Sequence, residues 1–272
     1  MISLERISRE MTEFEASRVV VLTGANEGIG YGMLTTLLED GYRVAALDVD
    51  GEHVRPLQET SPDRVRFYDC DVTVDGDVEA AIADVLDRWG TIDILVNNAA
   101  ILDFGFFEEQ TLADTRRTFE VNYFGYLRTI RAVLPHMLAR NEGRIHNVSS
   151  GVGLVGNPGL TGYASTKGAI ESFTRSLRLE LQHTNVSCSV MHPRLAKTRS
   201  ATALDYPASA MSDPTDVGRK LARQVESTDR VVMADWFTRV GLAVARLFPY
   251  LVKRGTERFV VEHESRTGER AR

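Results

Sequence analysis

The stretch RVVVLTGANEGIG, residues 18–30, decides the fold of this chain. Its first five residues form a largely apolar run that is typical of a buried β-strand. The run leads directly into a turn with glycines at positions 24, 28 and 30, and a segment with helical periodicity follows. In the order strand, glycine-rich turn, helix, such a turn allows backbone N–H groups and a helix N-terminus to approach a diphosphate group closely.

Further β-rich runs follow the first at intervals long enough for crossover helices. They are nearly all apolar instead of alternating, as expected of parallel strands that are covered on both faces. The predicted strands are residues 18–22, 43–48, 65–69, 92–96, 144–149, 186–191 and 230–233. Helical periodicity is clearest at residues 77–89, 112–138 and 162–181. We therefore expect an α/β fold with a single doubly wound parallel sheet of the Rossmann type and helices on both faces.

The length of 272 residues suits one large α/β domain, which we expect to span residues 18–234. Residues 1–17 are predicted to be an N-terminal extension, because they have neither the apolar core of a signal peptide nor that of a membrane span. Residues 235–272 are expected to be an amphipathic helix and a polar tail that pack on the same domain.

Charge and cysteine content narrow the possible partners. A net charge of −6 leaves no basic surplus for binding a phosphate backbone, so nucleic acid is not an expected partner. Cys70 and Cys188 fall within the predicted strand pattern and show no metal-ligand spacing. We therefore expect two buried, reduced thiols, a cytoplasmic location and no metal site.

A carboxylate at the end of the second predicted strand supports dinucleotide binding. Asp48 stands eighteen residues after Gly30, where a carboxylate accepts hydrogen bonds from an adenosine ribose. Asp48 and Glu27 would both repel a 2′-phosphate, and neither position carries Arg or Lys. We therefore predict NAD in preference to NADP as the cofactor. The alternative is that Asp48 merely ends the strand.

Three polar residues form a candidate catalytic group. Tyr163 and Lys167 stand four residues apart in GYASTKGAI and so share one face of a predicted helix, and Ser150 precedes Tyr163 by thirteen positions. A phenol has a pKa of about 10, and a neighbouring ammonium group favours its ionised form, which makes Tyr163 a candidate acid/base. Ser150 would orient a substrate oxygen against this phenol. A Tyr-x-x-x-Lys pair alone is common on protein surfaces, so other motifs must support this interpretation.

Three further runs complete the pattern: Cys70-Asp71-Val72, Asn97-Asn98-Ala99-Ala100 and Val121-Asn122. Together with T-G-x-x-x-G-x-G, Ser150 and Y-x-x-x-K, they strongly resemble the short-chain dehydrogenase/reductase family over roughly residues 18–233. The resemblance implies homo-oligomers that pair through the long helices near residues 112–138 and 162–183.

The same resemblance implies a role for each residue of the site. Tyr163 would be the acid/base, Ser150 would position the substrate oxygen, Lys167 would hold the nicotinamide ribose and lower the pKa of Tyr163, and Asn122 would hold a water on the proton path. Besides Tyr163 and Lys167, the predicted cofactor-binding residues are Gly24, Asn26, Gly28, Ile29, Gly30, Asp48, Asp71, Val72, Asn98, Ala99, Pro193, Ala196 and Thr198.

The chain departs from the family pattern at two places. Ala100 replaces a common glycine, and Arg194 follows Pro193 where the family usually has glycine. Arg194 would contact the cofactor diphosphate, contact an anionic substrate, or instead point to solvent or form a structural ion pair. His146 and His192 are interpreted as strand or loop residues and not as catalysts.

The C-terminal part is expected to shape the substrate site. Residues 194–216 would cover an apolar ligand, and a basic amphipathic helix, kinked at Pro249, would follow the last strand. Its apolar stripe is Trp236, Val240, Ala243, Val244, Leu247 and Leu251, and its basic residues are Arg239, Arg246, Lys253 and Arg254. In order of preference, this helix would pack on the core or a second subunit, form a wall of an apolar substrate pocket, or lie on an anionic membrane surface.

The apolar C-terminal extension of this chain resembles those of family members that act on lipophilic alcohols. The sequence therefore predicts an oxidoreductase that transfers a hydride between NAD and a hydrophobic secondary alcohol or ketone, with Tyr163 as acid/base. The alternatives are a 3-oxoacyl thioester reductase and a non-catalytic dinucleotide-sensing protein.

Overall fold

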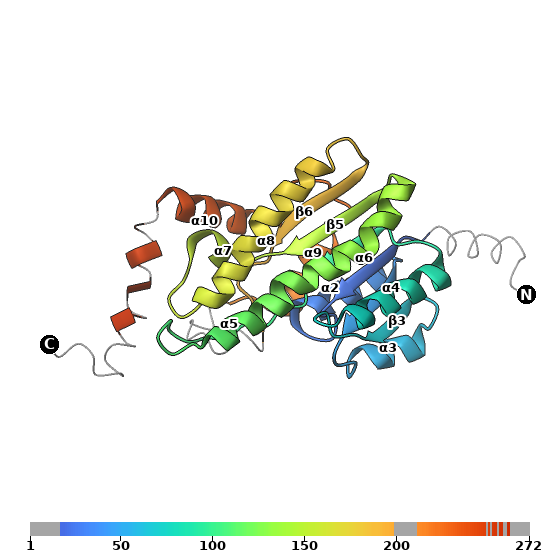
Figure 1. Cartoon of the computed structure of the whole chain (residues 1–272), viewed down its shortest axis with the longest axis horizontal. Helices are drawn as coiled ribbons and strands as arrows, with labels where there is room; N and C mark the ends of the chain where they lie inside the picture. Colours follow the sequence, from blue (N-terminus) through green and yellow to red (C-terminus); the bar gives the residue numbers. More distant parts are fainter. Residues whose placement is uncertain are drawn as a thin grey trace, which may run out of the picture.

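Seven parallel strands form one sheet in the computed structural model, which describes residues 17–198, 211–248, 250, 252–254, 256–257 and 260–261. The order of strands is β3-β2-β1-β4-β5-β6-β7 (Figure 1). This order confirms the single doubly wound sheet. All seven predicted runs form strands, with ends that move by at most two residues: β1 Val19–Thr23, β2 Arg43–Asp48, β3 Val65–Asp69, β4 Ile94–Asn97, β5 Gly143–Val148, β6 Val186–His192 and β7 Val231–Met233.

Both faces of the sheet are buried, which explains why the strands do not alternate between apolar and polar residues. In β1, Val20 and Leu22 belong to one apolar core, whereas Val19 and Val21 belong to the other. Helices α2 (Gly28–Glu39), α3 (Val54–Thr60) and α9 (Pro214–Ala222) cover the first core. Helices α4 (Asp75–Trp89), α6 (Gly125–Arg140) and α8 (Thr161–Glu180) cover the second and lie in front of the sheet in Figure 1.

The structure corrects the prediction of a single long helix over residues 112–138. The segment consists of α5 (Leu112–Phe119), a π-helical turn (Glu120–Phe124) and α6. A π-turn accommodates one extra residue within an otherwise continuous helix, so the apolar periodicity on either side conceals it. The turn carries Asn122, whose buried side-chain amide binds both backbone groups of Ile101 at 2.8 and 2.9 Å.

The C-terminal helix α10 (Trp236–Leu247) follows β7 and lies next to the short helix α7 (Val152–Val155) at one end of the molecule (Figure 1). Trp236, Val240 and Val244 of the predicted apolar stripe are 62%, 45% and 38% exposed. The expected kink at Pro249, the stripe residue Leu251, residues 199–210 of the expected cover and residues 1–16 of the expected extension lie outside the described residues.

Two further observations concern the environment of the protein. Among the described residues, no helix is long and apolar enough to cross a bilayer. Cys188 lies in β6, whereas Cys70 follows β3 instead of lying within it, and both are buried free thiols. Burial raises the pKa of each thiol to about 12, which leaves both unreactive near neutral pH.

Candidate active site

The glycine-rich turn between β1 and α2 is packed too tightly for side chains at two glycines. A Cβ atom on Gly24, which has φ +66°, would lie 2.7 Å from Cα of Ala99, and one on Gly30 would lie 1.8 Å from the carbonyl oxygen of Gly24. The Thr23 hydroxyl oxygen accepts hydrogen bonds of 3.0 Å from the backbone N–H groups of Asn98 and Ala99. The turn after β1 and the loop after β4 thus form one backbone cradle at the carboxyl ends of the strands, where open α/β sheets bind ligands.

The side chain of Asn98 holds this cradle together. Its amide donates hydrogen bonds to the carbonyl oxygens of Thr23 at 3.1 Å and Gly24 at 2.9 Å. On the other side of the turn, a Cβ atom on Gly28 would lie 3.4 Å from the Thr198 methyl group. The structure therefore brings together three segments that the sequence analysis joined only by resemblance: the glycine turn, the loop after β4 and the segment after β6.

Asp48 lies beside the glycine turn, because its Oδ2 accepts a hydrogen bond from the backbone N–H of Asn26 at 2.9 Å. The Asn26 Oδ1 in turn accepts one from the backbone N–H of His53 at 2.8 Å. Burial raises the pKa of the Asp48 carboxyl, and the backbone hydrogen bonds, that of Asn26 foremost, oppose this rise. Asp48 thus does more than end a strand, since it ties the end of β2 to the cradle.

Asp71 and Val72 lie at the same end of the sheet, just after β3. Oδ1 of Asp71 accepts a hydrogen bond of 2.8 Å from the backbone N–H of Thr73, which shapes the turn. Val72 is buried, and a Cβ atom on Gly125 would lie 2.8 Å from its Cγ2. Both residues are therefore held next to the start of α6.

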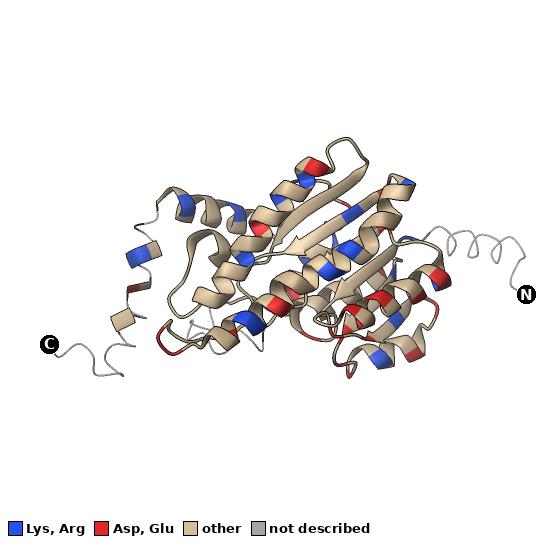
Figure 2. Ribbon diagram, in the orientation of Figure 1, with Lys and Arg blue, Asp and Glu red and all other residues tan. Residues whose placement is uncertain are grey.

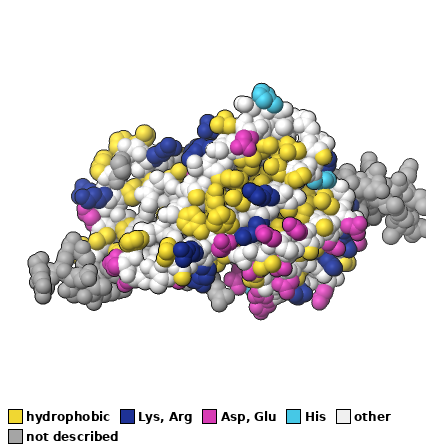
Figure 3. Space-filling view, viewed as in Figure 1, with side chains coloured by type: hydrophobic (Ala, Val, Ile, Leu, Met, Phe, Trp, Pro, Cys, Tyr) yellow, Lys and Arg dark blue, Asp and Glu magenta, His cyan; other side chains and the backbone are white. Residues whose placement is uncertain are grey.

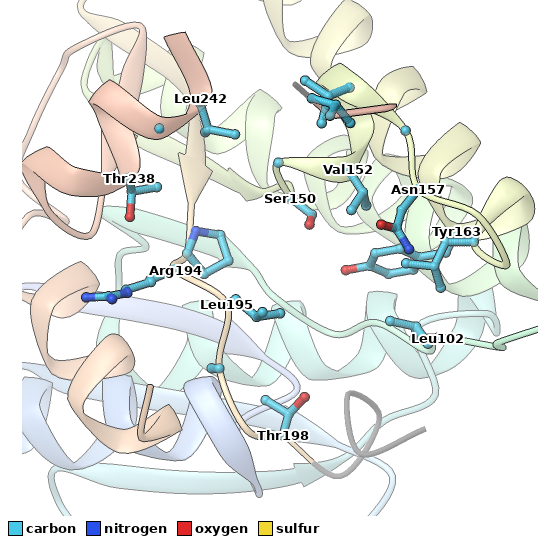
Figure 4. A pocket seen from close by; sticks show the side chains of 18 of the residues that line it. Leu102, Ser150, Val152, Asn157, Tyr163, Arg194, Leu195, Thr198, Thr238 and Leu242 are labelled. Carbon is cyan, nitrogen blue, oxygen red and sulfur yellow. The ribbon is translucent and has the colours of Figure 1, made fainter. Parts of the chain in front are cut away.

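The side chains of Tyr163 and Ser150 line the same cavity, which has a volume of about 610 Å³. Ser150 follows β5, Tyr163 is in the first turn of α8, and Figure 4 shows their hydroxyl groups directed into the same space. Burial raises the pKa of the Tyr163 phenol to about 12, although a hydrogen bond with Ser150 lowers it. The phenol is therefore protonated at neutral pH.

Lys167 lies beneath this phenol and is almost completely buried. Its Nζ is 5.6 Å from the centre of the Tyr163 ring and donates hydrogen bonds to the Val148 carbonyl at 2.9 Å and the Tyr126 hydroxyl at 3.3 Å. Burial lowers the pKa of this amine to about 7.

The sequence predicted that the Lys167 cation lowers the pKa of Tyr163, but the structure has the phenol pKa raised. The physical reason is desolvation, which disfavours the charged form of each group inside the protein. Both Tyr163 and Lys167 are thereby pushed towards their neutral forms.

The cavity joins these hydroxyl groups to apolar walls from several elements. Among the predicted residues it is lined by Ile29, Pro193, Ala196 and Thr198, with further walls from Leu102, Val152, Val155, Leu160 and Leu195. Helix α10 contributes Phe237, Thr238, Gly241 and Leu242. Asn122 and Lys167 are not in the lining and lie below it, packed inside the protein.

Arg194 forms a structural ion pair, one of the alternatives that the sequence left open. Its Nη1 lies 3.8 Å from Oδ2 of Asp235, and Figure 4 shows its guanidinium directed away from Tyr163 and Ser150. Asp235 in turn accepts a hydrogen bond from the backbone N–H of Thr238 at 2.8 Å, so Arg194 pairs with the residue that caps α10. His146 is buried in β5 and its pKa is lowered to about 4 by burial, so it is neutral.

Comparison with known proteins identifies the family. The family model described as short chain dehydrogenase matches residues 18–207. This chain belongs to the short-chain dehydrogenase/reductase family. It is 36% identical over 199 residues to 2-(R)-hydroxypropyl-CoM dehydrogenase from Xanthobacter autotrophicus, covering 70% of this chain and 80% of that protein.

Two other members of the family are similarly related. The 3-alpha-(or 20-beta)-hydroxysteroid dehydrogenase of Mycobacterium tuberculosis is 32% identical over 181 residues, which cover 66% of this chain and 70% of that protein. The crystal structure of 3-ketoacyl-(acyl-carrier-protein) reductase from Brucella melitensis complexed with NADH superimposes with a TM-score of 0.73 and 26% identity, covering 79% of this chain and 96% of that one.

Sequence reasoning missed two residues of this short-chain dehydrogenase. Thr23 belongs to the quoted glycine motif, but only the structure shows its hydroxyl linking two loops. Tyr126 is buried in α6 and its hydroxyl donates to the Val148 carbonyl at 3.2 Å while accepting from Lys167. Its position four residues after Asn122 was a signal, since residues four apart share a helix face.

Proposed function

We propose that this short-chain dehydrogenase transfers a hydride between NAD and a hydrophobic secondary alcohol or its ketone, with Tyr163 as the acid/base. The observation that carries the proposal is the convergence of the Tyr163 and Ser150 hydroxyl groups on a cavity whose other walls are mainly apolar. Such a cavity favours a substrate with one oxygen to orient and an apolar body to bury. The names of two relatives, a 2-(R)-hydroxypropyl-CoM dehydrogenase and a 3-alpha-(or 20-beta)-hydroxysteroid dehydrogenase, agree with oxidation at a hydroxyl group.

The residues of the site would divide the work as follows. The nicotinamide supplies the hydride chemistry when it is bound. Ser150 would orient the substrate oxygen, and the neutral Tyr163 phenol would donate a proton to that oxygen during ketone reduction. During alcohol oxidation, the phenolate would accept the proton, and Lys167 would hold the nicotinamide ribose beside it. Asn122 would support proton relay from beneath the cavity.

We propose NAD as the cofactor, held by the glycine turn and the ends of β2 and β3. The cradle fits a diphosphate, because the glycine turn leads directly into the N-terminus of α2, where backbone N–H groups favour an anion, and the missing side chains at Gly24 and Gly30 let the turn pack closely on the loop after β4. Asp48 stands where an adenosine ribose would bind, and its negative charge disfavours a 2′-phosphate. The complex of the Brucella relative with NADH is consistent with this choice. The residues that we propose to contact NAD are the cofactor-binding residues predicted from the sequence.

The test combines cofactor binding with turnover. Purified protein is incubated with NAD and a panel of secondary alcohols, and formation of NADH is followed by absorbance. Tyr163→Phe is expected to keep NAD affinity and lose roughly a hundred-fold or more of turnover. Tyr68→Phe, which removes a phenol that binds Asp84 on the surface, is the matched control and should remain active. Undiminished turnover of Tyr163→Phe would contradict the role of this residue.

Reduction of 3-oxoacyl thioesters is the second candidate, favoured by the fold of the Brucella reductase. Preference for NADPH together with turnover of 3-oxoacyl thioesters, but not of simple alcohols, would favour it. NAD binding without turnover of any alcohol, ketone or thioester would instead favour a dinucleotide-sensing protein.

We further propose a cytoplasmic homo-oligomer that pairs through α5, α6 and α8, and we assign residues 235–272 to the same domain. Large apolar side chains are exposed on this face: Leu112, Phe124, Leu138 and Leu179. Figure 3 shows hydrophobic side chains gathered over α6 and α8. Sedimentation of the protein and of Phe124→Glu tests this pairing, since a charge at the interface should yield monomers.

A further inference from the structure

A second cavity, of about 540 Å³, lies between α8, the strands β6 and β7, and the outer part of α10. It is separate from the substrate cavity, although Leu242 lines both. Its walls are largely apolar and include Leu154, Val190, Met233, Leu242 and Leu247. Neither the proposed cofactor residues nor Tyr163 and Ser150 take part in it.

The charge around this second cavity is strongly positive. Five arginines line it, namely Arg175, Arg178, Arg230, Arg239 and Arg246, against a single carboxylate, that of Glu171. They come from α8, the residue before β7, and α10, which line this cavity together, and Figure 2 shows basic positions on both helices. The protein as a whole carries a net charge of −6, so this concentration of cations is not a general property of its surface.

The arginines differ in their partners. Arg178 donates hydrogen bonds to the carbonyl oxygens of Cys188 at 3.0 Å and Thr228 at 2.8 Å, which makes it structural. Arg175 lies 3.5 Å from Glu171. No ion pair with a described carboxylate engages Arg230, Arg239 or Arg246, and these three are exposed at the rim. The rim therefore offers guanidinium groups that are available to an anion.

The interior of the cavity contains a polar group without a partner. His192 is 1% exposed, and its Nε2 lies 2.9 Å from Oε1 of the buried Glu171. The other ring nitrogen, Nδ1, is buried and has no hydrogen-bond partner among the described residues. Buried polar atoms are nearly always paired, so this lining residue leaves one polar atom unsatisfied among the described residues, whereas the charge that can attract a ligand lies at the rim.

We propose that this second cavity is a binding site for a carboxylate with an apolar body. The carboxylate pairs with Arg239 and Arg246 at the rim, because guanidinium groups bind carboxylates through charge-assisted, often bidentate hydrogen bonds. The apolar body lies against Leu242 and Met233 inside. This role explains the basic character of α10, for which the sequence offered three alternative roles.

The test measures binding of decanoate by isothermal titration calorimetry, with decanol and decylammonium as probes of the head group. Decanoate is expected to bind more tightly than decanol, and decylammonium is expected not to bind. The double variant Arg239→Gln/Arg246→Gln should lose at least ten-fold in decanoate affinity. These experiments need no turnover, so their failure is distinguishable from failure of the proposed dehydrogenase activity.

Arg194→Gln is the matched control, because Arg194 lines the substrate cavity and not the second one. Its affinity for decanoate should equal that of the unmodified protein. The proposal is overturned if decanoate does not bind, if the double variant binds it as well as the unmodified protein does, or if Arg194→Gln alone abolishes binding. Circular dichroism of each variant verifies that it is folded.

Discussion

Replacement of Gly30 by Ala tests the cradle at the start of α2. A Cβ atom there would lie 1.8 Å from the carbonyl oxygen of Gly24, whereas real Cβ atoms essentially never approach closer than 3.0 Å. The two backbone segments would have to separate by at least about 1.2 Å, and no side-chain rotation relieves such a contact. Overpacking of this kind costs about 3 kcal/mol, from which the better helix propensity of Ala recovers about 1 kcal/mol.

We therefore expect Gly30→Ala to lose about 2 kcal/mol of unfolding free energy and at least ten-fold in NAD affinity. Urea denaturation measures the first quantity, and quenching of protein fluorescence by NAD measures the second. Gly76→Ala in α4 is the matched control, since a Cβ atom there meets nothing within 4 Å and should stabilise the helix by about 0.5 kcal/mol. If Gly30→Ala matches Gly76→Ala in stability and NAD affinity, the cradle geometry is wrong.

Three further variants test the buried polar groups. Burial lowers the Lys167 pKa from 10.5 to about 7, so the charged amine destabilises the folded protein fully below pH 7, and this destabilisation disappears as the pH rises towards 10.5. The free energy of unfolding of the unmodified protein, relative to that of Lys167→Met, should therefore rise between pH 6 and pH 10. Urea denaturation should show a rise of at most roughly 5 kcal/mol. Tyr126→Phe removes a hydrogen bond to Val148 and one from Lys167, and should cost about 1–2 kcal/mol in the same assay. Asp93→Ala removes the 2.8 Å hydrogen bond that the Val19 N–H donates to Asp93 and leaves this N–H without a partner. The free energy of unfolding should fall by about 2–3 kcal/mol, which a lower midpoint of thermal unfolding would show.

The sheet could be predicted from the sequence almost to the residue, and the reason lies in its burial. Strands covered on both faces must be apolar almost throughout, so central runs such as residues 43–48 and 94–97 end where polar residues begin. The helices were less accessible. The π-turn at residues 120–124 leaves no mark in the apolar periodicity, because the extra residue is inserted between two segments that are each regular.

The candidate site was predictable as a set of residues but not as an electrostatic environment. Spacing on a helix places Tyr163 and Lys167 on one face, and the structure agrees with that. The depth at which they lie cannot be obtained from spacing, and depth decides the direction of the Tyr163 pKa. Likewise, the ion pair of Arg194 depends on Asp235, which is forty-one residues away in the chain and approaches only because β6 and β7 are neighbours.

The division of labour in this molecule follows from which residues the parallel sheet can position. The cradle and the Tyr163 and Ser150 hydroxyl groups lie at strand ends or on helices that pack directly on the sheet, so their geometry is determined by the buried core. The walls from α10 come from a helix that lies beside α7 at one end of the molecule, and its Leu242 side chain lines both cavities and closely approaches Gly151, beside Ser150. If the proposed function holds, a change in α10 should therefore alter which molecules are accepted while turnover of small alcohols is retained, because the Tyr163 and Ser150 hydroxyl groups are positioned by elements that pack on the sheet.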